Sequence, residues 1–277
     1  MDKFGLIGCP IAHSLSPKLF TAAYNGKYRY ELIETPDFSE AWSRFLKEYR
    51  AINVTAPFKG DAFRMADWKS PECERVGATN LCLRTPEGVK AWNSDYMGVK
   101  ALLEPLEKGS AAVIGFGGAG KAALAAAEDL GFDTTLYRHD GIASGVKADV
   151  IIYTLPKAVE GIDKLDCETL IEANYKDPCL SGHRGYIPGT AWHLRQAVLG
   201  YGIMSGEAPG HRGYAKSISL ICSATSRTDF PDVSTVSAAC EYIGSRAANS
   251  LSASLKSGRE ASLSPMRERI SSSEALR

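Results

Sequence analysis

Residues 111–120 read Ala-Ala-Val-Ile-Gly-Phe-Gly-Gly-Ala-Gly, and this stretch decides the fold of the second half of the chain. An apolar strand candidate runs straight into the pattern G-x-G-x-x-G, and an alanine-rich helix candidate at residues 121–130 follows at once. In a dinucleotide-binding turn, Gly115 permits the tight bend, Gly117 lets the backbone approach a pyrophosphate, and Gly120 brings helix and strand together. The free N–H groups at the start of the helix would face that anion. An ordinary strand-to-helix turn is the alternative, and the agreement of placement with spacing favours the dinucleotide. The cofactor-binding candidates in this turn are Gly115, Gly117, Gly118, Ala119 and Gly120.

The chain after the glycine turn alternates short apolar runs with polar loops, as a parallel sheet requires. Three further strands are predicted at residues 134–138, 150–154 and 170–175. The first of them ends in Arg138, whose guanidinium suits the 2′-phosphate of NADP, whereas NAD-type sites place an acidic residue there. We therefore predict NADP as the cofactor. NAD stays open, because Asp140 is close by and a surface arginine is often only solvated.

The first half of the chain also alternates strands with helices. Strands are predicted at residues 3–7, 28–34 and 51–55, and helices at residues 17–24, 38–49 and 59–68. Ser16 is the predicted cap of the first helix. Residues 78–84 and 89–92 flank Thr85-Pro86-Glu87-Gly88, which is typical of a hairpin turn. An antiparallel pair beside a parallel alternation predicts a mixed sheet.

These patterns predict an α/β fold with an N-terminal α/β substrate domain on a mixed sheet, followed by a short Rossmann-type NAD(P)-binding domain. The predicted parts are a substrate-binding and catalytic domain at 1–97, a Rossmann dinucleotide-binding domain at 98–189, a C-terminal helix returning to the substrate domain at 190–212, and a tail at 213–277. The tail is rich in serine and loses apolar periodicity, so we expect it to be disordered.

The composition limits the classes of function. The 277-residue chain balances 32 Lys and Arg against 32 Asp and Glu, so no overall field favours nucleic acid or an anionic membrane. The seven cysteines are scattered without a CxxC pair, and the first residues hold no basic segment followed by a long apolar run. We therefore expect a reduced, cytoplasmic protein without membrane insertion. The five histidines show no metal-ligand spacing such as HExxH, so no metal is expected.

Three polar clusters lie at the ends of predicted strands in the first half. Ser14 and Ser16 place two hydroxyls at a helix start, where the dipole favours a carboxylate, although a helix cap with a second serine explains them equally. Lys59 ends the stretch Asn-Val-Thr-Ala-Pro-Phe-Lys at the head of another helix, where a lone lysine is usually surface decoration. Asn80 and Asp95 support a functional role for Lys59, because they add amide and carboxylate groups at successive strand ends.

The motifs S-x-S, NVTxPxK, GAxN, N-x-D and GxGGxG follow one another along the chain. The shikimate dehydrogenase family has these motifs in the same order, so the sequence resembles that family over about residues 3–206. It implies the reversible NADP-dependent reduction of 3-dehydroshikimate to shikimate, a step toward chorismate and the aromatic amino acids. The implied partners are this small-molecule substrate pair, without nucleic acid or membrane, and the implied assembly is a monomer or homodimer.

The resemblance also implies the site residues. Lys59 and Asp95 would form the catalytic pair, and Gly189 would lie near the nicotinamide. The residues implied to bind substrate are Ser14 and Ser16 for the carboxylate, Thr55, Asn80 and Asp95 for ring hydroxyls, and Tyr175 and Gln196. Chemistry supports the lysine independently, because loss of hydride from a secondary alcohol requires a side chain that receives the hydroxyl proton.

Two segments depart from the family pattern. The family carries an Asn-Arg-Thr type signature where this chain has Tyr-Arg-His at 137–139, and an Asn-Ala-Thr-Ser type segment where this chain has Tyr-Thr-Leu-Pro at 153–156. Two alternatives therefore stay open, a quinate/shikimate dehydrogenase using NAD(P) and a ligand-binding regulator without turnover on the same fold.

Overall fold

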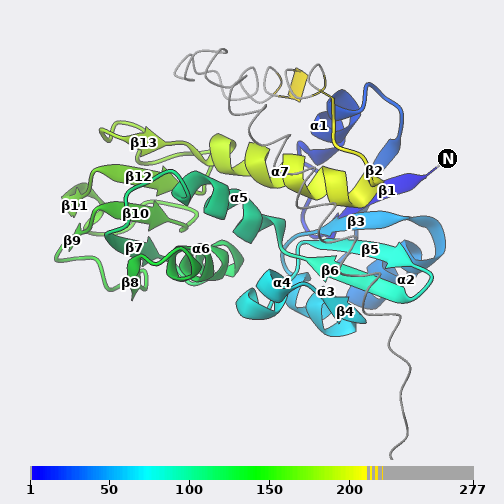
Figure 1. Cartoon of the computed structure of the whole chain (residues 1–277), viewed down its shortest axis with the longest axis horizontal. Coiled ribbons are helices and arrows are strands. Elements are labelled where there is room, and N and C mark those ends of the chain that lie inside the picture. The colour runs from blue at the N-terminus through cyan, green and yellow to red at the C-terminus, as the bar shows by residue number, and fades with distance from the viewer. Residues whose placement is uncertain (1, 211–212, 214–215, 218–219, 221–277) are drawn as a thin grey trace, which may run out of the picture.

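Two β-sheets form the framework of the protein in the computed structural model, which describes residues 2–210, 213, 216, 217 and 220. The first sheet has six strands in the order β2-β1-β3-β5-β6-β4, and the second has five in the order β13-β12-β10-β7-β8 (Figure 1). A small two-stranded sheet, β11-β9, lies beside the second. The predicted α/β class, with a mixed sheet followed by a Rossmann-type sheet, is confirmed.

The first sheet is mixed, as predicted. Its strands are β1 (Lys3–Gly8), β2 (Arg29–Glu34), β3 (Ala51–Val54), β4 (Trp68–Lys69), β5 (Leu81–Thr85) and β6 (Gly88–Trp92). Strand β1 runs parallel to β2 and β3, whereas β5 is antiparallel to both β3 and β6. The carboxyl ends of β1, β3 and β6 therefore share one edge of the sheet with the start of β5, and side chains that follow or precede these points converge there.

The helices of the first half are α1 (Ser16–Ala23), α2 (Phe38–Glu48), α3 (Lys59–Met65) and α4 (Pro71–Val76). Helix α2 begins where the Asp37 carboxylate accepts hydrogen bonds from the N–H groups of Ser39 and Glu40, and it buries Trp42 and Phe45 against the sheet. Two predicted details were wrong. Ser16 is the first residue of α1 rather than its cap, and the helix predicted to reach residue 68 ends at Met65, because β4 pairs with β6.

The second sheet is entirely parallel. Its strands are β7 (Ser110–Ile114), β8 (Asp133–Tyr137), β10 (Val150–Tyr153), β12 (Thr169–Glu172) and β13 (Tyr186–Ile187). The alanine-rich helix α6 (Gly118–Asp129) covers one face. The other face is covered by loops, the one-turn helix η1 (Ile162–Lys164) and the short strands β9 (Val146–Lys147) and β11 (Leu165–Asp166). Within the described residues, this sheet therefore lacks the second layer of helices that a full doubly wound domain would have.

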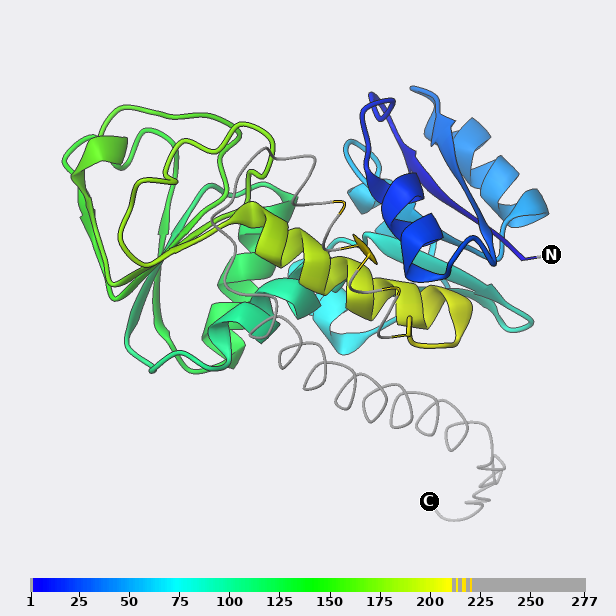
Figure 2. The same cartoon turned by 90° about the horizontal axis from the view of Figure 1, so that it is seen from above.

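Two helices join the sheets. Helix α5 (Ser94–Leu103) packs against both α6 and α7 (Gly189–Ser205), and Figure 2 shows α7 extending from the second sheet to the first. Gly98 allows this approach, because a Cβ there would lie 2.9 Å from the backbone nitrogen of Gln196. Trp192 of α7 belongs to the core beside α6, whereas Tyr201 and Met204 belong to the core of the first sheet. Because both helices serve both cores, the boundaries 1–97, 98–189 and 190–212 stay predictions.

The predicted tail at 213–277 lies outside the described residues except at positions 213, 216, 217 and 220. None of the helices in the described part of the chain combines the length and apolarity needed to cross a bilayer.

Candidate active site

A cleft with a volume of about 470 Å³ opens at the shared edge of the first sheet and faces the start of α7. Every residue predicted to act in catalysis or to bind substrate lines it. These residues are Ser14, Ser16, Thr55, Lys59, Asn80, Asp95, Tyr175 and Gln196. The topology explains their convergence, since they follow β1, β3 and β6, precede β5, or lie beside and along α7.

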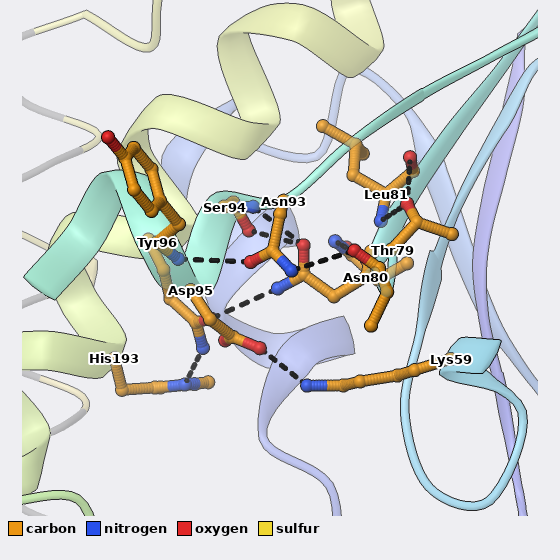
Figure 3. Close-up of polar contacts among 12 residues, drawn as sticks. Lys59, Thr79, Asn80, Leu81, Asn93, Ser94, Asp95, Tyr96 and His193 are labelled. Carbon is orange, nitrogen blue, oxygen red and sulfur yellow. Dashed lines mark hydrogen bonds and ion pairs between the residues drawn. The ribbon is translucent and has the colours of Figure 1, made fainter. Parts of the chain in front are cut away.

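Lys59 and Asp95 form an ion pair in the cleft, with 2.5 Å between Nζ and Oδ2 (Figure 3). Lys59 is the first residue of α3, a position where the helix dipole disfavours a cation. Asp95 lies in the first turn of α5, a favourable place for a carboxylate, and the Asn93 side chain caps that helix by accepting from the Tyr96 N–H at 3.0 Å. The attraction of the Asp95 carboxylate therefore offsets the unfavourable placement of the Lys59 ammonium at a helix start. Both side chains keep some exposure, 23% and 13%, so a ligand in the cleft can reach them.

Asn80 is buried behind this ion pair and connects the wall formed by α5 with α7. Its Oδ1 accepts from the backbone N–H of Ser94 at 2.7 Å and from the Ser94 hydroxyl at 3.2 Å. Its Nδ2 donates to Oε1 of Gln196 at 3.4 Å. These hydrogen bonds pair both polar atoms of the Asn80 amide with α5 and α7. Asn80 therefore stabilises the cleft wall in addition to lining the cleft.

Three hydroxyl side chains also line the cleft. The Ser14 and Ser16 hydroxyl oxygens lie 3.2 Å apart, and Ser14 Oγ also accepts from the Ser16 N–H at 3.3 Å. Thr55 extends β3 by one residue, since its N–H donates to the Ile7 carbonyl at 3.0 Å, and its side chain faces the same cleft. These three residues can offer hydroxyl donors to a carboxylate or a polyol.

His193, which the sequence analysis did not single out, forms the wall beside Tyr175. The two rings stack with centroids 4.8 Å apart, and Gln196 Nε2 lies 2.7 Å from His193 Nδ1. Burial lowers the pKa of His193 to about 4, against the opposing effect of the nearby Asp95 carboxylate. Burial likewise raises the pKa of the Tyr175 phenol. The spacing of His193 three residues before Gln196, on one helix face, was the available signal.

Further polar cleft residues to which the sequence analysis assigned no role are Cys9, His13, Asn53, Ser94 and Tyr201. Asn53 belongs to the NVTxPxK motif, yet no separate role was predicted for it. It lies within a strand rather than after one, and it is fixed by long-range bonds, accepting from the Tyr30 hydroxyl at 2.8 Å and donating to the Asn80 carbonyl at 3.2 Å.

The glycine turn lies next to the catalytic candidates. Gly115 has a φ of 100°, and a Cβ on Gly120 would lie 2.0 Å from the Gly115 carbonyl oxygen, so both positions require glycine. A Cβ on Gly117 would meet no atom within 4 Å, which leaves room for an anion at the start of α6. A Cβ on Gly118 would lie 3.4 Å from Cδ of Lys59. The turn and Lys59 therefore come together from the two halves of the molecule.

Arg138 and Gly189 lie outside the residues that line the cleft. Arg138 directly follows β8, is exposed, and makes no side-chain hydrogen bond or ion pair with the residues that the structure describes. Gly189 begins α7, where a Cβ would lie 2.5 Å from the Ala173 carbonyl oxygen, so close backbone packing accounts for the glycine. Among the described residues, no group of three or more His, Cys, Asp or Glu side chains is arranged to hold a metal ion.

The fold and the cleft define a class, an α/β protein in which a polar cleft on a mixed sheet faces the glycine turn of a Rossmann-type sheet. A family model described as the shikimate dehydrogenase substrate binding domain matches residues 6–82. A shikimate dehydrogenase (NADP(+)) from Haloarcula marismortui is 32% identical over 213 residues, which are 72% of this chain and 78% of that relative. The chain belongs to the shikimate dehydrogenase family.

Another relative, a shikimate dehydrogenase (NADP(+)) from Thermus thermophilus, is 36% identical over 148 residues, 50% of this chain and 55% of the relative. The chain thus spans about half the length of that relative. The solved shikimate 5-dehydrogenase of Thermus thermophilus in complex with NADP(H) and shikimate aligns with a TM-score of 0.69 at 21% identity, covering 80% of this chain and 100% of the other. Shikimate dehydrogenase from Mycobacterium tuberculosis gives a TM-score of 0.64 at 28% identity, covering 79% and 100%.

Proposed function

We propose that this protein catalyses the reversible NADP-dependent reduction of 3-dehydroshikimate to shikimate. The observation that carries the proposal is the Lys59–Asp95 pair, which lies in the cleft directly beside Gly118 of the glycine turn. The names of the relatives from Haloarcula and Thermus support the same activity. In metabolism the reaction would contribute to chorismate and aromatic amino acid synthesis.

Lys59 moves the proton of the reacting hydroxyl. In the reductive direction its ammonium donates a proton to the developing alkoxide, and in the oxidative direction the neutral amine receives the hydroxyl proton. Asp95 holds the Lys59 amine at a fixed position and offers an acceptor to a substrate hydroxyl. The hydroxyls of Ser14 and Ser16 bind the substrate carboxylate, and the hydroxyl of Thr55 contacts a ring hydroxyl.

The glycine turn would hold the pyrophosphate of NADP against the start of α6. The open space at Gly117 and the absence of acidic residues in the first turn of α6 fit an anion there. Arg138, which is exposed at the end of β8, would contact the 2′-phosphate, and Gly189 would lie beside the nicotinamide. When bound, NADP supplies the hydride chemistry that the side chains lack.

The direct test follows NADPH absorbance with purified protein and 3-dehydroshikimate, and the reverse reaction with NADP. Shikimate and quinate are compared in parallel, and each is repeated with NAD. We expect turnover with shikimate and NADP to exceed turnover in the other three combinations. Higher turnover with quinate would identify a quinate/shikimate dehydrogenase. Binding of shikimate by calorimetry without any absorbance change would refute the enzymatic proposal and identify a ligand-binding regulator.

A further inference from the structure

One ring nitrogen of His193, a residue that lines the cleft, has no hydrogen-bond partner among the described residues. Its ring lines the cleft and is stacked by Tyr175, and its Nε2 is shielded from solvent without a hydrogen-bond partner among the described residues. Buried polar atoms in proteins are nearly always paired, so such an atom at the wall of a binding cleft points to a ligand. Figure 3 shows His193 and Lys59 pointing toward one another from opposite sides, with Asp95 between them.

A chain of hydrogen bonds fixes which nitrogen of this imidazole carries the proton. The chain starts at the backbone N–H of Ser94, which can only donate, so the Asn80 atom 2.7 Å away must be the oxygen. The Asn80 amide nitrogen then faces Gln196, whose oxygen must accept from it at 3.4 Å. The Gln196 amide nitrogen is thereby turned to His193 and donates to Nδ1 at 2.7 Å. Nδ1 is an acceptor and carries no proton.

The remaining nitrogen, Nε2, therefore carries the proton of the neutral ring. The imidazole is neutral at physiological pH because burial lowers its pKa to about 4, although the Asp95 carboxylate opposes this shift. A neutral Nε2–H donates one hydrogen bond and accepts none. Stacking on Tyr175 and the bond to Gln196 hold the ring in place, so the direction of this donor is set before any ligand binds.

We propose that His193 is a specificity-determining residue whose Nε2–H donates a hydrogen bond to a ring oxygen of the bound cyclohexene substrate, on the side of Asp95 opposite Lys59. The inference rests on the proposed function. The substrate is favoured over the cofactor as the acceptor because the neighbours of His193 are Tyr175, Gln196 and Asp95, which all line the cleft, whereas the glycine turn approaches the cleft at Lys59.

Two matched variants distinguish the contribution of Nε2 from that of Nδ1. In His193→Gln the longer amide places an N–H donor near the position of Nε2. In His193→Asn the shorter amide reaches only the position of Nδ1, so the donor to the substrate is lost. With the donor gone, we expect KM for shikimate to rise about tenfold to a hundredfold with kcat little changed, and we expect His193→Gln to recover most of that loss. Thermal unfolding of both variants verifies that each is folded.

Nitrogen NMR of the purified protein with labelled histidine, recorded without ligands and after each ligand is added, gives a readout that a purely structural role would not move. The chain has five histidines, and the signals of His193 are identified as those that disappear in His193→Gln. We expect a neutral ring protonated at Nε2, and a change in the Nε2 signal when shikimate is added but not when NADP alone is added. A ring protonated at Nδ1, a response to NADP alone, or equal KM values for His193→Asn and wild type would each overturn the inference.

The same measurements distinguish this inference from the proposed function. Binding of shikimate with the expected Nε2 response but without turnover refutes the dehydrogenase activity and leaves the role of His193 intact. Turnover without the Nε2 response refutes the role of His193 alone. Failure to bind shikimate at all refutes both.

Discussion

Replacing Gly120 by alanine tests whether the glycine turn is built by close backbone packing. A Cβ at this position would lie 2.0 Å from the Gly115 carbonyl oxygen, 2.8 Å from its carbon and 3.0 Å from the Thr154 hydroxyl oxygen. Cβ atoms essentially never approach another atom closer than 3.0 Å, so the carbonyl would have to move by about 1 Å. Two of the three contacts are with backbone, which cannot turn away as a flexible side chain does.

The size of the effect follows from two opposing contributions. Overpacking of this kind costs about 1–3 kcal/mol. Alanine favours a helix over glycine by up to about 1 kcal/mol, and this gain is small in the first turn, where Gly120 lies. We therefore expect a net loss of about 1–2 kcal/mol in the free energy of unfolding. For a chain of this size that lowers the unfolding temperature by about 2–8 °C.

Gly117→Ala is the matched control, because a Cβ there would meet no atom within 4 Å and φ is −76°. Its free energy of unfolding should stay within about 0.5 kcal/mol of wild type. If the turn binds a pyrophosphate, however, the methyl group occupies the space through which the anion approaches, and the Kd for NADP should rise at least about tenfold. Urea unfolding measures the first quantity for both variants, and calorimetric titration with NADP measures the second.

The reasoning fails in either of two ways. If Gly120→Ala unfolds at the same urea concentration as wild type, the turn relaxes without cost and the close contact does not fix its shape. If Gly117→Ala binds NADP as tightly as wild type, the backbone at Gly117 does not approach the cofactor. If Gly120→Ala were as stable as wild type while Gly117→Ala were destabilised, the close packing would lie at Gly117 and the open space at Gly120, the opposite of what we infer.

Three further perturbations have defined outcomes. Lys59→Ala should lower kcat by about 10²–10⁴-fold with Kd for NADP unchanged, and unchanged steady-state turnover would remove Lys59 from the mechanism. The pKa of His193 is about 4 when folded, against about 6.5 when unfolded, so the unfolded chain takes up this proton first and stability falls as the pH drops from 6.5 toward 4. Between pH 7 and 4.5 wild type should lose about 2 kcal/mol more than His193→Gln in urea unfolding, and parallel losses would contradict this. Glu172 is fully buried, and its carboxylate accepts hydrogen bonds from the Tyr186 hydroxyl at 2.8 Å and from two N–H groups of the loop after β12. Because Glu172→Ala removes these bonds, it should speed proteolysis within residues 173–185. Cleavage of the variant at the wild-type rate would show that Glu172 does not hold this loop in place.

The parts of the fold that sequence reasoning predicted are those that local patterns determine. The strand, glycine turn and helix at residues 110–130 depend on neighbours in sequence, and their bounds agree with the structure to within three residues. The structure also brings Lys59 and Asp95 together, as the family resemblance implied, because both lie at the same edge of the first sheet. The family resemblance added Tyr175 and Gln196, for which no local pattern gave a reason.

The parts that were missed depend on contacts between distant residues. Strand β4 is two residues long and exists only because β6 lies beside it. Ser16 has the side chain of a good helix cap, yet α1 starts on Ser16 itself, and Ser14 accepts from its N–H. His193 of α7 stacks on Tyr175, which lies 18 residues earlier in the loop after β12, so no local pattern could predict the contact. Arg138 and Gly189 remain predictions as cofactor contacts.

Helix α7 has a consequence for the whole molecule. Because it supplies Trp192 to the interior of one half and Met204 to that of the other, neither half can exclude water from its interior when the helix is taken away. A chain that ended before residue 189 would therefore leave apolar surface exposed on both halves. The cleft and the glycine turn thus both depend on the packing of this helix, and a change that loosens α7 should loosen both.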